Sequence, residues 1–380
     1  RRSSDLDLAL PGVDEFKLRA SYGTAGLRPG FDAQYEIFTL VGGFPRPLTV
    51  GNRALKPAYS RETEIGFNLS FLQNYTFEYS YSDKTTSDQI LLAPVSRASG
   101  YTNQWKNAGT LSGATHEIAL GAVLISSGDM FWRVNVTADR TRQQIDALSI
   151  APYLAGPDAT TQVFKIAPGE SFGVIYGERF IRTQAQLEQT IASGNLTGTV
   201  SDYTRNEEGF FVRAADWRTL SERPLKYYTE DGETVVRIGD VNPDVNLALN
   251  STFQWKGLSF STLITSVVGG DIYNLTRQWP FNEQRNPVFD QRSKPVVERK
   301  PVTYYQTFYN GISPTDYFVE NGSYVRLREL AVNYTLPSAW VRRPLGAIGF
   351  ETARVGLVGR NLWTSTNYKG YDPDVTGTSG

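Results

Sequence analysis

Side-chain polarity alternates residue by residue in one stretch of this chain, and that alternation restricts its fold more than any other feature. From Tyr75 to Ser82 each odd position is aromatic and each even position is polar. Successive side chains of a β-strand point to opposite faces, so the four rings would share one face. Residues 64–71 repeat the pattern, and only residues 72–74 separate the two stretches. We therefore expect a β-hairpin with one apolar face and one polar face.

The same pattern recurs in about nine segments of roughly 9–14 residues, which is long enough for a tilted strand to cross a hydrocarbon layer. The segments begin near Phe16, Glu62, Tyr75, Ala114, Met130, Val245, Leu258, Ser323 and Ala353. Short links fall at 72–74, 126–129, 256–257 and, less tightly, 337–352, whereas long links fill 25–61, 84–113, 142–244 and 269–322. Links that alternate between tight turns and long loops are typical of membrane β-barrels, and a soluble sandwich gives no reason for them.

The fold class predicted is therefore all-β, a transmembrane antiparallel β-barrel with long extracellular loops. An odd number of strands does not close a bacterial single-chain barrel, so we expect part of a larger barrel. On this interpretation the last strand runs outward and residues 367–380 begin another external loop.

Composition excludes several classes of function. The chain has no cysteine and one histidine, His116, so disulfides, thiolate metal sites and two-histidine metal sites are excluded, while paired-carboxylate glycosidase chemistry is not. With 38 Lys+Arg against 39 Asp+Glu, no basic field favours nucleic acid. No run of about 18 apolar residues exists, which excludes an α-helical membrane span. Residues 1–7 lack the apolar region of a signal peptide, so the chain is either cytoplasmic or a piece of something longer.

The two strand faces predict different surroundings. Residues of the inward parity would line a polar lumen, although a soluble protein would show them as a solvated face: Lys17, Arg19, Glu64, Glu78, Arg133, Asp139 and Arg354. Trp132 and Trp255 lie at strand ends, where we expect an aromatic girdle at the level of the lipid headgroups, with an ordinary core position as the alternative. In the turn Lys256-Gly257 we expect the glycine to supply a positive φ.

Two arginines conflict with this pattern. Arg326 and Arg328 share the parity of the apolar residues between 330 and 336. An arginine facing lipid at mid-membrane costs roughly 2–4 kcal/mol. We therefore expect both to lie beyond the apolar band or to follow a β-bulge that changes the phase of the strand.

The long links contain the candidate ligand contacts. Flat rings there would stack on sugar or peptide ligands, with packing inside the loops as the competing role: Trp217, Tyr227, Tyr228, Trp279, Tyr304 and Tyr305. The acidic turn 230–233 lacks the alternating carboxylates of a calcium loop, so we expect a solvated turn. His116 shares parity with apolar neighbours, so we expect it to lie at the membrane interface or to have its hydrogen bonds satisfied within the protein. We expect no catalytic residue, no metal and no cofactor.

Several segments resemble the SusC/RagA family of TonB-dependent outer-membrane importers, in family order and over nearly the whole chain. The matching segments are Phe16–Gly23, Leu55–Pro57 with Glu62–Phe67, Gly100-Tyr101 with Asn107–Gly109, Gly169–Gly177, Ile238–Asp240 with Pro243-Asp244, Gly269–Asn274, Tyr324–Arg328, Tyr334–Pro337, Gly359–Trp363 and Tyr368–Asp374. Many relatives carry an Asp-rich loop before the Ile-Gly-Asp segment, and here that place holds Glu230–Thr234, which puts a metal there in doubt.

The resemblance implies a barrel of about 22 strands in a Gram-negative outer membrane, with an N-terminal plug that contacts TonB. Residues 1–380 would then be the C-terminal part of that barrel, without the plug and the last strand. The resemblance also implies a SusD-like surface lipoprotein, outer-membrane lipid as surroundings, and an oligosaccharide or oligopeptide as cargo. Two alternatives stay open: a passive or structural outer-membrane barrel, and a secreted soluble glycan-binding β-protein or glycosidase.

Overall fold

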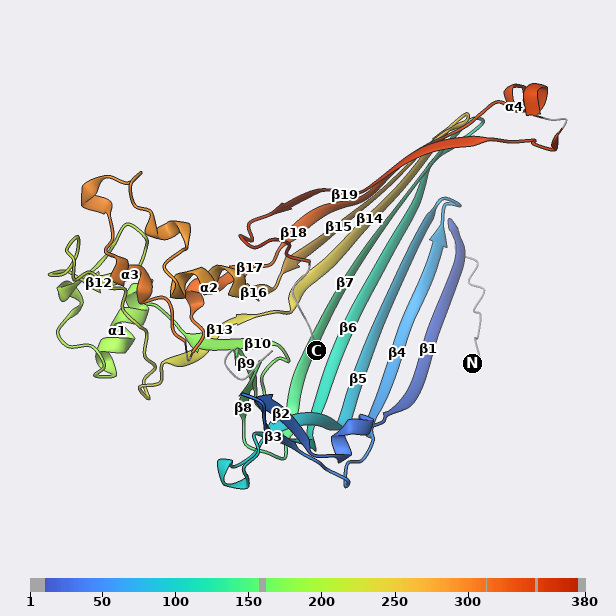
Figure 1. Cartoon of the computed structure of the whole chain (residues 1–380). Helices are drawn as coiled ribbons and strands as arrows, with labels where there is room; N and C mark the ends of the chain where they lie inside the picture. The colour runs from blue at the N-terminus through green and yellow to red at the C-terminus, as the bar shows by residue number, and fades with distance from the viewer. Residues whose placement is uncertain (1–10, 157–161, 312, 346–347, 375–380) are drawn as a thin grey trace. The chain divides into compact units, whose positions relative to one another are not determined.

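A computed structural model describes residues 11–156, 162–311, 313–345 and 348–374 (Figure 1). The expectations for residues 1–7 and for the loop end at 375–380 lie outside these residues. The chain divides into a sheet unit, residues 1–151, 243–269 and 323–366, and a loop unit, residues 152–242, 270–322 and 367–380. No helix of the described part is long and apolar enough to cross a membrane.

The sheet unit is built on an eleven-stranded sheet, nine of whose strands form one continuous path, as predicted (Figure 1). In order these are β1 (Val13–Leu27), β4 (Ala58–Phe71), β5 (Tyr75–Pro94), β6 (Asn103–Ser127), β7 (Met130–Leu148), β14 (Pro243–Trp255), β15 (Leu258–Gly269), β18 (Tyr324–Thr335) and β19 (Arg354–Thr366). Each pairs with its neighbours antiparallel. The hairpin β2 (Ile37–Val41) and β3 (Phe44–Val50), the 3-10 helices η1 (Phe31–Gln34) and η2 (Arg97–Ser99), and the helix α4 (Ser338–Leu345) complete the unit.

One predicted long link is wrong. Residues 84–113 were expected to form an external loop, but β5 continues to Pro94 and β6 begins at Asn103. Backbone hydrogen bonds between strands do not require apolar side chains. The ladder therefore continues past the point where apolar alternation ends, and a prediction based on that alternation stops too early. The strand β7 likewise extends to Leu148, beyond the predicted start of its loop at 142.

The strand register separates the side chains into two faces. Leu18, Phe67, Tyr79 and Ile118 lie opposite one another across β1, β4, β5 and β6. The adjacent row, one residue away along each strand, presents Arg19, Gly66, Ser80 and Glu117. The apolar face is open, since Leu18 is 49%, Ile65 53% and Tyr22 69% exposed. Where its rings are half-buried they contact rings of the neighbouring strand, as Phe67 and Phe77 do with centroids 5.4 Å apart.

A β-bulge resolves the conflict at Arg326 and Arg328. The register of β18 shifts between Leu327 and Glu329 against both neighbouring strands. Past the shift the apolar parity passes to Leu327 and Val325, while Arg326 lies opposite Thr265 and Thr364 on the polar face. Arg326 donates to the Thr364 hydroxyl at 3.0 Å, and Arg328 donates to the Thr265 hydroxyl at 2.9 Å. The phase change was one of the two predicted solutions, and it is confirmed.

The turn between β14 and β15 differs from its prediction. The positive φ, 49°, belongs to Lys256 and not to Gly257. Gly257 is needed for a different reason: a Cβ built on it would lie 2.5 Å from the Thr335 carbonyl oxygen of β18. The Gly257 carbonyl also accepts a 2.8 Å hydrogen bond from the Thr335 amide. Glycine therefore permits close approach of a third strand.

Opposite effects are expected from substituting the two turn residues. Gly257→Ala should weaken the β15–β18 seam by roughly 1–3 kcal/mol, because the methyl group forces the backbones apart. Lys256→Gly should be neutral or slightly stabilising, since glycine adopts a positive φ without steric cost. The measurement is the urea midpoint of the full-length protein in detergent, followed by gel mobility of the folded form. Equal midpoints for the two variants would contradict the assignment.

The loop unit combines small sheets with short helices around an aromatic core. A four-stranded sheet has the order β13 (Val235–Asp240), β10 (Val174–Glu178), β9 (Phe164–Ile166) and β8 (Tyr153–Ala155). Two further pairs are β11 (Tyr203–Arg205) with β12 (Phe211–Arg213), and β16 (Asp271–Tyr273) with β17 (Val319–Asn321). The helices are α1 (Gln184–Ala192), α2 (Leu275–Asn282) and α3 (Val302–Gln306), with 3-10 helices η3 (Val200–Asp202), η4 (Pro287–Phe289), η5 (Val296–Glu298) and η6 (Asp316–Phe318).

The core of the loop unit draws on both long links. Phe180, Phe210 and Val212 come from the link between β7 and β14, and they pack with residues from the link between β15 and β18: Phe281, Tyr304, Tyr305, Phe308 and Phe318. Aromatic rings that stack or meet edge to face stabilise a core by more than the surface area that they bury. The two links therefore fold as one body.

Candidate functional site

The polar face of the sheet is a hydrogen-bonded surface. Arg19 donates to the Ser80 hydroxyl at 2.9 Å, and Ser80 in turn donates to the Glu64 carboxylate at 3.4 Å. Farther along, the Asn246 amide donates to the Asp139 carboxylate at 2.8 Å. All seven residues predicted to line a lumen share this face by strand register: Lys17, Arg19, Glu64, Glu78, Arg133, Asp139 and Arg354.

The opposite face forms an apolar band. On β14 its parity runs from Val245 to Trp255, and the ten steps between these residues, at about 3.4 Å each and tilted by about 40°, span roughly 26 Å along the membrane normal. That height matches the outward apolar band of outer-membrane barrels, about 25 Å. Trp255 and Trp132 both lie near the turn end of this face, where the indole of Trp132 donates to Ser251 at 3.0 Å.

His116 lies on the same face and is satisfied there. Its Nδ1 lies 2.8 Å from the Tyr79 hydroxyl, and its ring centroid lies 4.9 Å from that of Tyr81. Both contacts are with rings of the neighbouring strand β5. This is the satisfied histidine that the sequence predicted.

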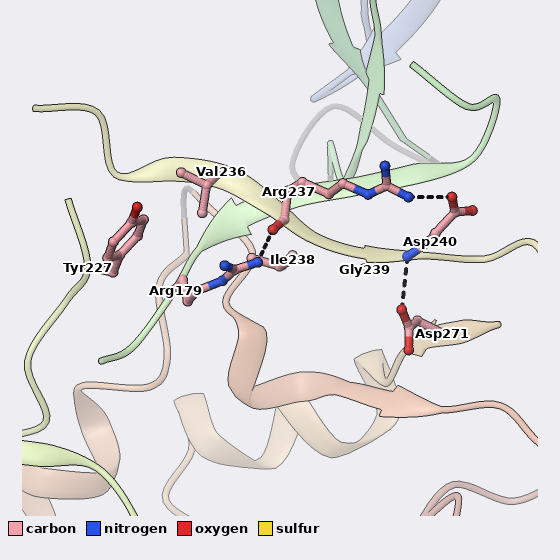
Figure 2. Close-up of a pocket in the computed structure, with 8 residues that line it drawn as sticks. All are labelled: Arg179, Tyr227, Val236, Arg237, Ile238, Gly239, Asp240 and Asp271. Carbon is pink, nitrogen blue, oxygen red and sulfur yellow. Dashed lines mark hydrogen bonds and ion pairs between the residues drawn. The ribbon is translucent and has the colours of Figure 1, made fainter. Parts of the chain in front are cut away.

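The loop unit contains a pocket of about 450 Å³, shown in Figure 2. Its lining residues are Arg179, Tyr227, Val236, Arg237, Ile238, Gly239, Asp240 and Asp271. Arg179 donates to the carbonyl of Arg237, and Arg237 forms a 2.7 Å ion pair with Asp240. The Asp240 amide donates to Asp271 at 3.0 Å. Two guanidinium and two carboxylate groups give the pocket polar walls without net charge.

Local backbone pairing positions these groups. Gly239 pairs with Ile175 of β10, and a Cβ on Gly239 would lie 3.0 Å from the Asp271 carboxylate. Two of the segments that carry the family resemblance, Ile238–Asp240 and Gly269–Asn274, therefore meet at this pocket. Sequence reasoning did not select Arg179, Arg237, Asp240 or Asp271 as site residues. The signal that could have found the two aspartates was the presence of both segments in one long-loop region.

The six predicted ligand residues lie in different environments. Tyr227 lines the pocket of Figure 2, where its hydroxyl donates to Gln189 at 2.8 Å. Its neighbour Tyr228 is half-buried, and its amide donates to the Thr190 hydroxyl at 3.2 Å. Trp217 is exposed with the Arg218 guanidinium 4.5 Å from its ring centroid. These three rings come from the link between β7 and β14.

Trp279 borders a second cavity, of about 250 Å³, and is 62% exposed. The cavity is also lined by Tyr273, Tyr309, Gln278 and Asn310. Aromatic faces beside amide groups can stack on a flat ligand and hydrogen-bond to its polar edge. Trp279 is the most exposed of the six predicted residues.

Tyr304 and Tyr305 lie in the aromatic core, and each is 0% exposed. Burial raises the pKa of both phenols, so both remain protonated. The Tyr305 hydroxyl donates to Glu208 at 2.5 Å, and the Tyr304 hydroxyl accepts from Asn206 at 2.8 Å. In this structure their role is the competing one, packing within the loops, and neither offers a face to a ligand.

A buried ionic cluster beside these rings joins the two long links. The Lys300 ammonium lies 2.7 Å from Glu222 and 2.8 Å from Glu207, and the side chains of Lys300 and Glu222 are each 1% exposed. Asn206 donates to Glu222 at 2.9 Å, and the Arg218 side chain pairs with Glu207 at 2.7 Å. Lys300 follows β16 and α2 in the chain, whereas its partners precede β13. The cluster therefore holds the body that carries both cavities.

Acid should loosen this cluster at a defined pH. Burial opposes ionisation of Glu207, but hydrogen bonds from Lys300 and Arg218 outweigh it and lower the pKa of that carboxyl to about 2. A carboxyl with a lowered folded-state pKa contributes stability above its unfolded pKa, about 4.3, and loses it as pH falls toward 2. Glu207→Gln should therefore reduce the protection of the loop unit against hydrogen exchange at pH 7. In this variant the protection should also decrease less than in the unchanged protein as the pH falls from about 4.5 to 2. Hydrogen exchange measures both, and parallel pH profiles for the two proteins would contradict the assignment.

Metal binding finds no support in the described residues, among which no group of three or more His, Cys, Asp or Glu side chains could hold an ion. The acidic turn 230–233 is closed by its own backbone: the Gly232 amide donates to the Thr229 carbonyl at 3.0 Å, and Gly232 has a φ of 79°. This is a turn held by internal hydrogen bonds.

The amphipathic antiparallel sheet, with tight turns at one end of its strands and long folded links at the other, defines a membrane-spanning β-barrel wall. Residues 11–206, just over half of the chain, match the family described as "TonB dependent receptor-like, beta-barrel". The chain belongs to this family. Its place is therefore the bacterial outer membrane, and both the predicted fold class and the resemblance to TonB-dependent importers are confirmed.

Similar proteins cover nearly the whole chain. TonB-dependent receptors P3 and P26 of Formosa agariphila are 24% and 25% identical over 96% and 95% of this chain. The chain spans 36% of the length of each of these relatives. Structures described as the RagAB peptide transporter and the RagAB peptide importer in the "closed-closed" state are 21% and 20% identical, with TM-scores of 0.65 and 0.68. They cover 96% of this chain, which covers 38% and 39% of theirs, and the likeness is one of fold.

Proposed function

We propose that this chain supplies barrel wall and external loops to an outer-membrane importer that takes up a nutrient with energy delivered through TonB. The observation that carries the proposal is the two-faced sheet: one apolar face suits lipid, and one hydrogen-bonded polar face suits a water-filled passage. The long links add a folded body with two cavities that could receive a ligand. Family membership supports an importer over a barrel with a purely structural role.

The proposal includes parts outside this sequence. The chain would be the C-terminal part of its barrel, short of the last strand, and the plug with its TonB contact would belong to the rest of the protein. The 36% share of the curated relatives' length supports a larger whole. A SusD-like lipoprotein is the proposed partner at the external loops, and transport energy would enter through the plug.

The proposed cargo is an oligopeptide or an oligosaccharide. The printed descriptions of RagAB as a peptide transporter support the peptide. The Trp279 cavity is compatible with both, because a ring can stack on a sugar or on a peptide plane and the amides of Gln278 and Asn310 can bind either. Trp217, Tyr227, Tyr228 and Trp279 are the proposed ligand contacts.

Uptake of labelled cargo by cells tests the proposal. Cells that carry the full-length protein should accumulate a fluorescent oligopeptide mixture or a fluorescent oligosaccharide mixture, and accumulation should stop when an uncoupler removes the proton gradient. Uptake that persists with the uncoupler would favour the passive barrel. A full-length protein that stays in the aqueous fraction without detergent would favour the soluble alternative.

Trp279→Ala should weaken binding of the transported mixture roughly 2–10-fold, because one stacking face is lost. Val296→Ala, which removes another exposed apolar side chain from the same link, should leave binding unchanged. Affinity is measured with the purified full-length protein by fluorescence anisotropy. Equal affinities for both variants would remove Trp279 from the proposed site.

A further inference from the structure

The link between β18 and β19 differs from the other links at its end of the sheet. Those links are tight turns at residues 72–74, 128–129 and 256–257, whereas this one contains the helix α4. Figure 1 shows α4 at the same end of the sheet as the tight turns. In outer-membrane barrels the short turns face the periplasm. The additional residues of this link therefore need a role that a tight turn does not serve.

The side chains of α4 present an aromatic and cationic surface. Val341 is 2% exposed, whereas Trp340 on the same turn is 67% exposed. Arg342 and Arg343 follow, and both are exposed. The only carboxylate of the link, Glu351, lies 4.0 Å from Arg342, and both side chains are largely in solvent. The helix therefore offers a free indole and an excess of positive charge.

The position of α4 follows from the apolar band. Leu336 is the last apolar residue of the outer face before the link, and its amide donates to the Ala353 carbonyl at 2.9 Å. The helix α4 begins at Ser338, two residues farther, which is about 7 Å along the strand and about 5 Å along the membrane normal at a 40° tilt. The interfacial layer on each side of the hydrocarbon core is roughly 5–7 Å thick. The helix therefore begins at the level of the phospholipid headgroups, continuous with the lipid-facing band.

We propose that α4 is a lipid-binding helix that rests in the headgroup layer of the periplasmic leaflet. Trp340 inserts its ring at the boundary between hydrocarbon and headgroups, as amphipathic rings do. Arg342 and Arg343 bind lipid phosphates, because a planar guanidinium donates two parallel hydrogen bonds to phosphate oxygens. The occupant is anionic phospholipid, and the proposal rests on the outer-membrane family and not on import.

A fluorophore on the helix tests this proposal. Residues 1–380 contain no cysteine, so Ala339→Cys carries the only label of this segment once cysteines elsewhere in the full-length protein are replaced by serine. The protein is reconstituted into vesicles of phosphatidylcholine, with or without phosphatidylglycerol. Asp129→Cys, in the tight turn between β6 and β7, is the matched control. Quenching is measured with a headgroup spin-labelled lipid and with aqueous iodide.

The label at 339 should be quenched at least twofold more by the headgroup spin label than by iodide, and the label at 129 should show the reverse. Arg342→Gln with Arg343→Gln should abolish the gain that phosphatidylglycerol produces at 339. Iodide quenching at 339 equal to that at 129 would overturn the proposal. Protection from both quenchers would show that protein covers the helix, and headgroup quenching without any effect of the arginine substitutions would overturn the phosphate contacts.

Discussion

Replacing Leu249 with arginine is expected to prevent most of the full-length protein from reaching its folded state in the outer membrane. Leu249 lies in the middle of the apolar band, opposite Val136 of β7 and Ile264 of β15. A guanidinium on the lipid face at mid-membrane costs roughly 2–4 kcal/mol, a large part of the stability of an ordinary domain. The measurement is the fraction of protein that migrates as the folded form on a gel without heating, with the outer-membrane fraction as its source.

Asn250→Arg provides the matched control one residue away. Asn250 lies opposite Asn135 on the polar face and is exposed. An arginine there remains in water, so the folded fraction should stay near that of the unchanged protein. Equal loss for both substitutions would mean that the two faces do not have different surroundings. A greater loss for Asn250→Arg would mean that their assignment is reversed.

Lys300→Met is expected to open the loop unit locally. The substitution removes the ammonium from between Glu222 and Glu207 and leaves Glu222, 1% exposed, without its cationic partner. Breaking a buried ion pair from one side costs about 3–5 kcal/mol, because the remaining charge is buried and uncompensated. Protection against hydrogen exchange should therefore fall by roughly 100-fold or more in β11, β12 and α3, while the sheet unit keeps its protection.

Two further variants separate charge from packing. Glu222→Gln added to Lys300→Met should recover much of the protection, because no unpaired carboxylate remains at that position. Arg292→Gln breaks the solvent-exposed pair with Asp290 in the same link and should have no measurable effect. If Lys300→Met behaves like Arg292→Gln, the buried cluster does not hold the two links together.

The sheet was predictable because a physical period specifies it. A strand with lipid on one side and water on the other must alternate, and residues 75–82 alternate without exception. The same logic made Arg326 informative: an arginine in the wrong phase required a compensating feature, and the structure supplies the bulge. What the period did not specify was the strand ends, since pairing beyond the apolar band depends on the backbone alone.

The loop unit was not predictable in the same way. From the sequence, Tyr304 and Tyr305 were predicted to be exposed residues that stack on a ligand. In the structure they pack against Phe308 and Phe289 of their own link, in a core that also contains rings of the other long link. The long links have no alternating pattern of polarity. Their sequence therefore does not predict which residues, about a hundred positions apart, come into contact. The pocket of Figure 2 has the same origin, because it joins Arg179 to Asp271. The prediction for the turn at Gly257 was wrong for a related reason. The atom that a Cβ at Gly257 would crowd belongs to a third strand.

Spin labels placed singly at each position from Tyr75 to Ser82 test the central claim most directly. In lipid vesicles the account predicts that oxygen, which concentrates in hydrocarbon, reaches labels at 75, 77, 79 and 81, while a water-soluble nickel complex reaches labels at 76, 78, 80 and 82. Accessibility should thus reverse at every residue. Labels at the four aromatic positions that neither reagent reaches, or that the nickel complex reaches best, would contradict a barrel wall that faces lipid.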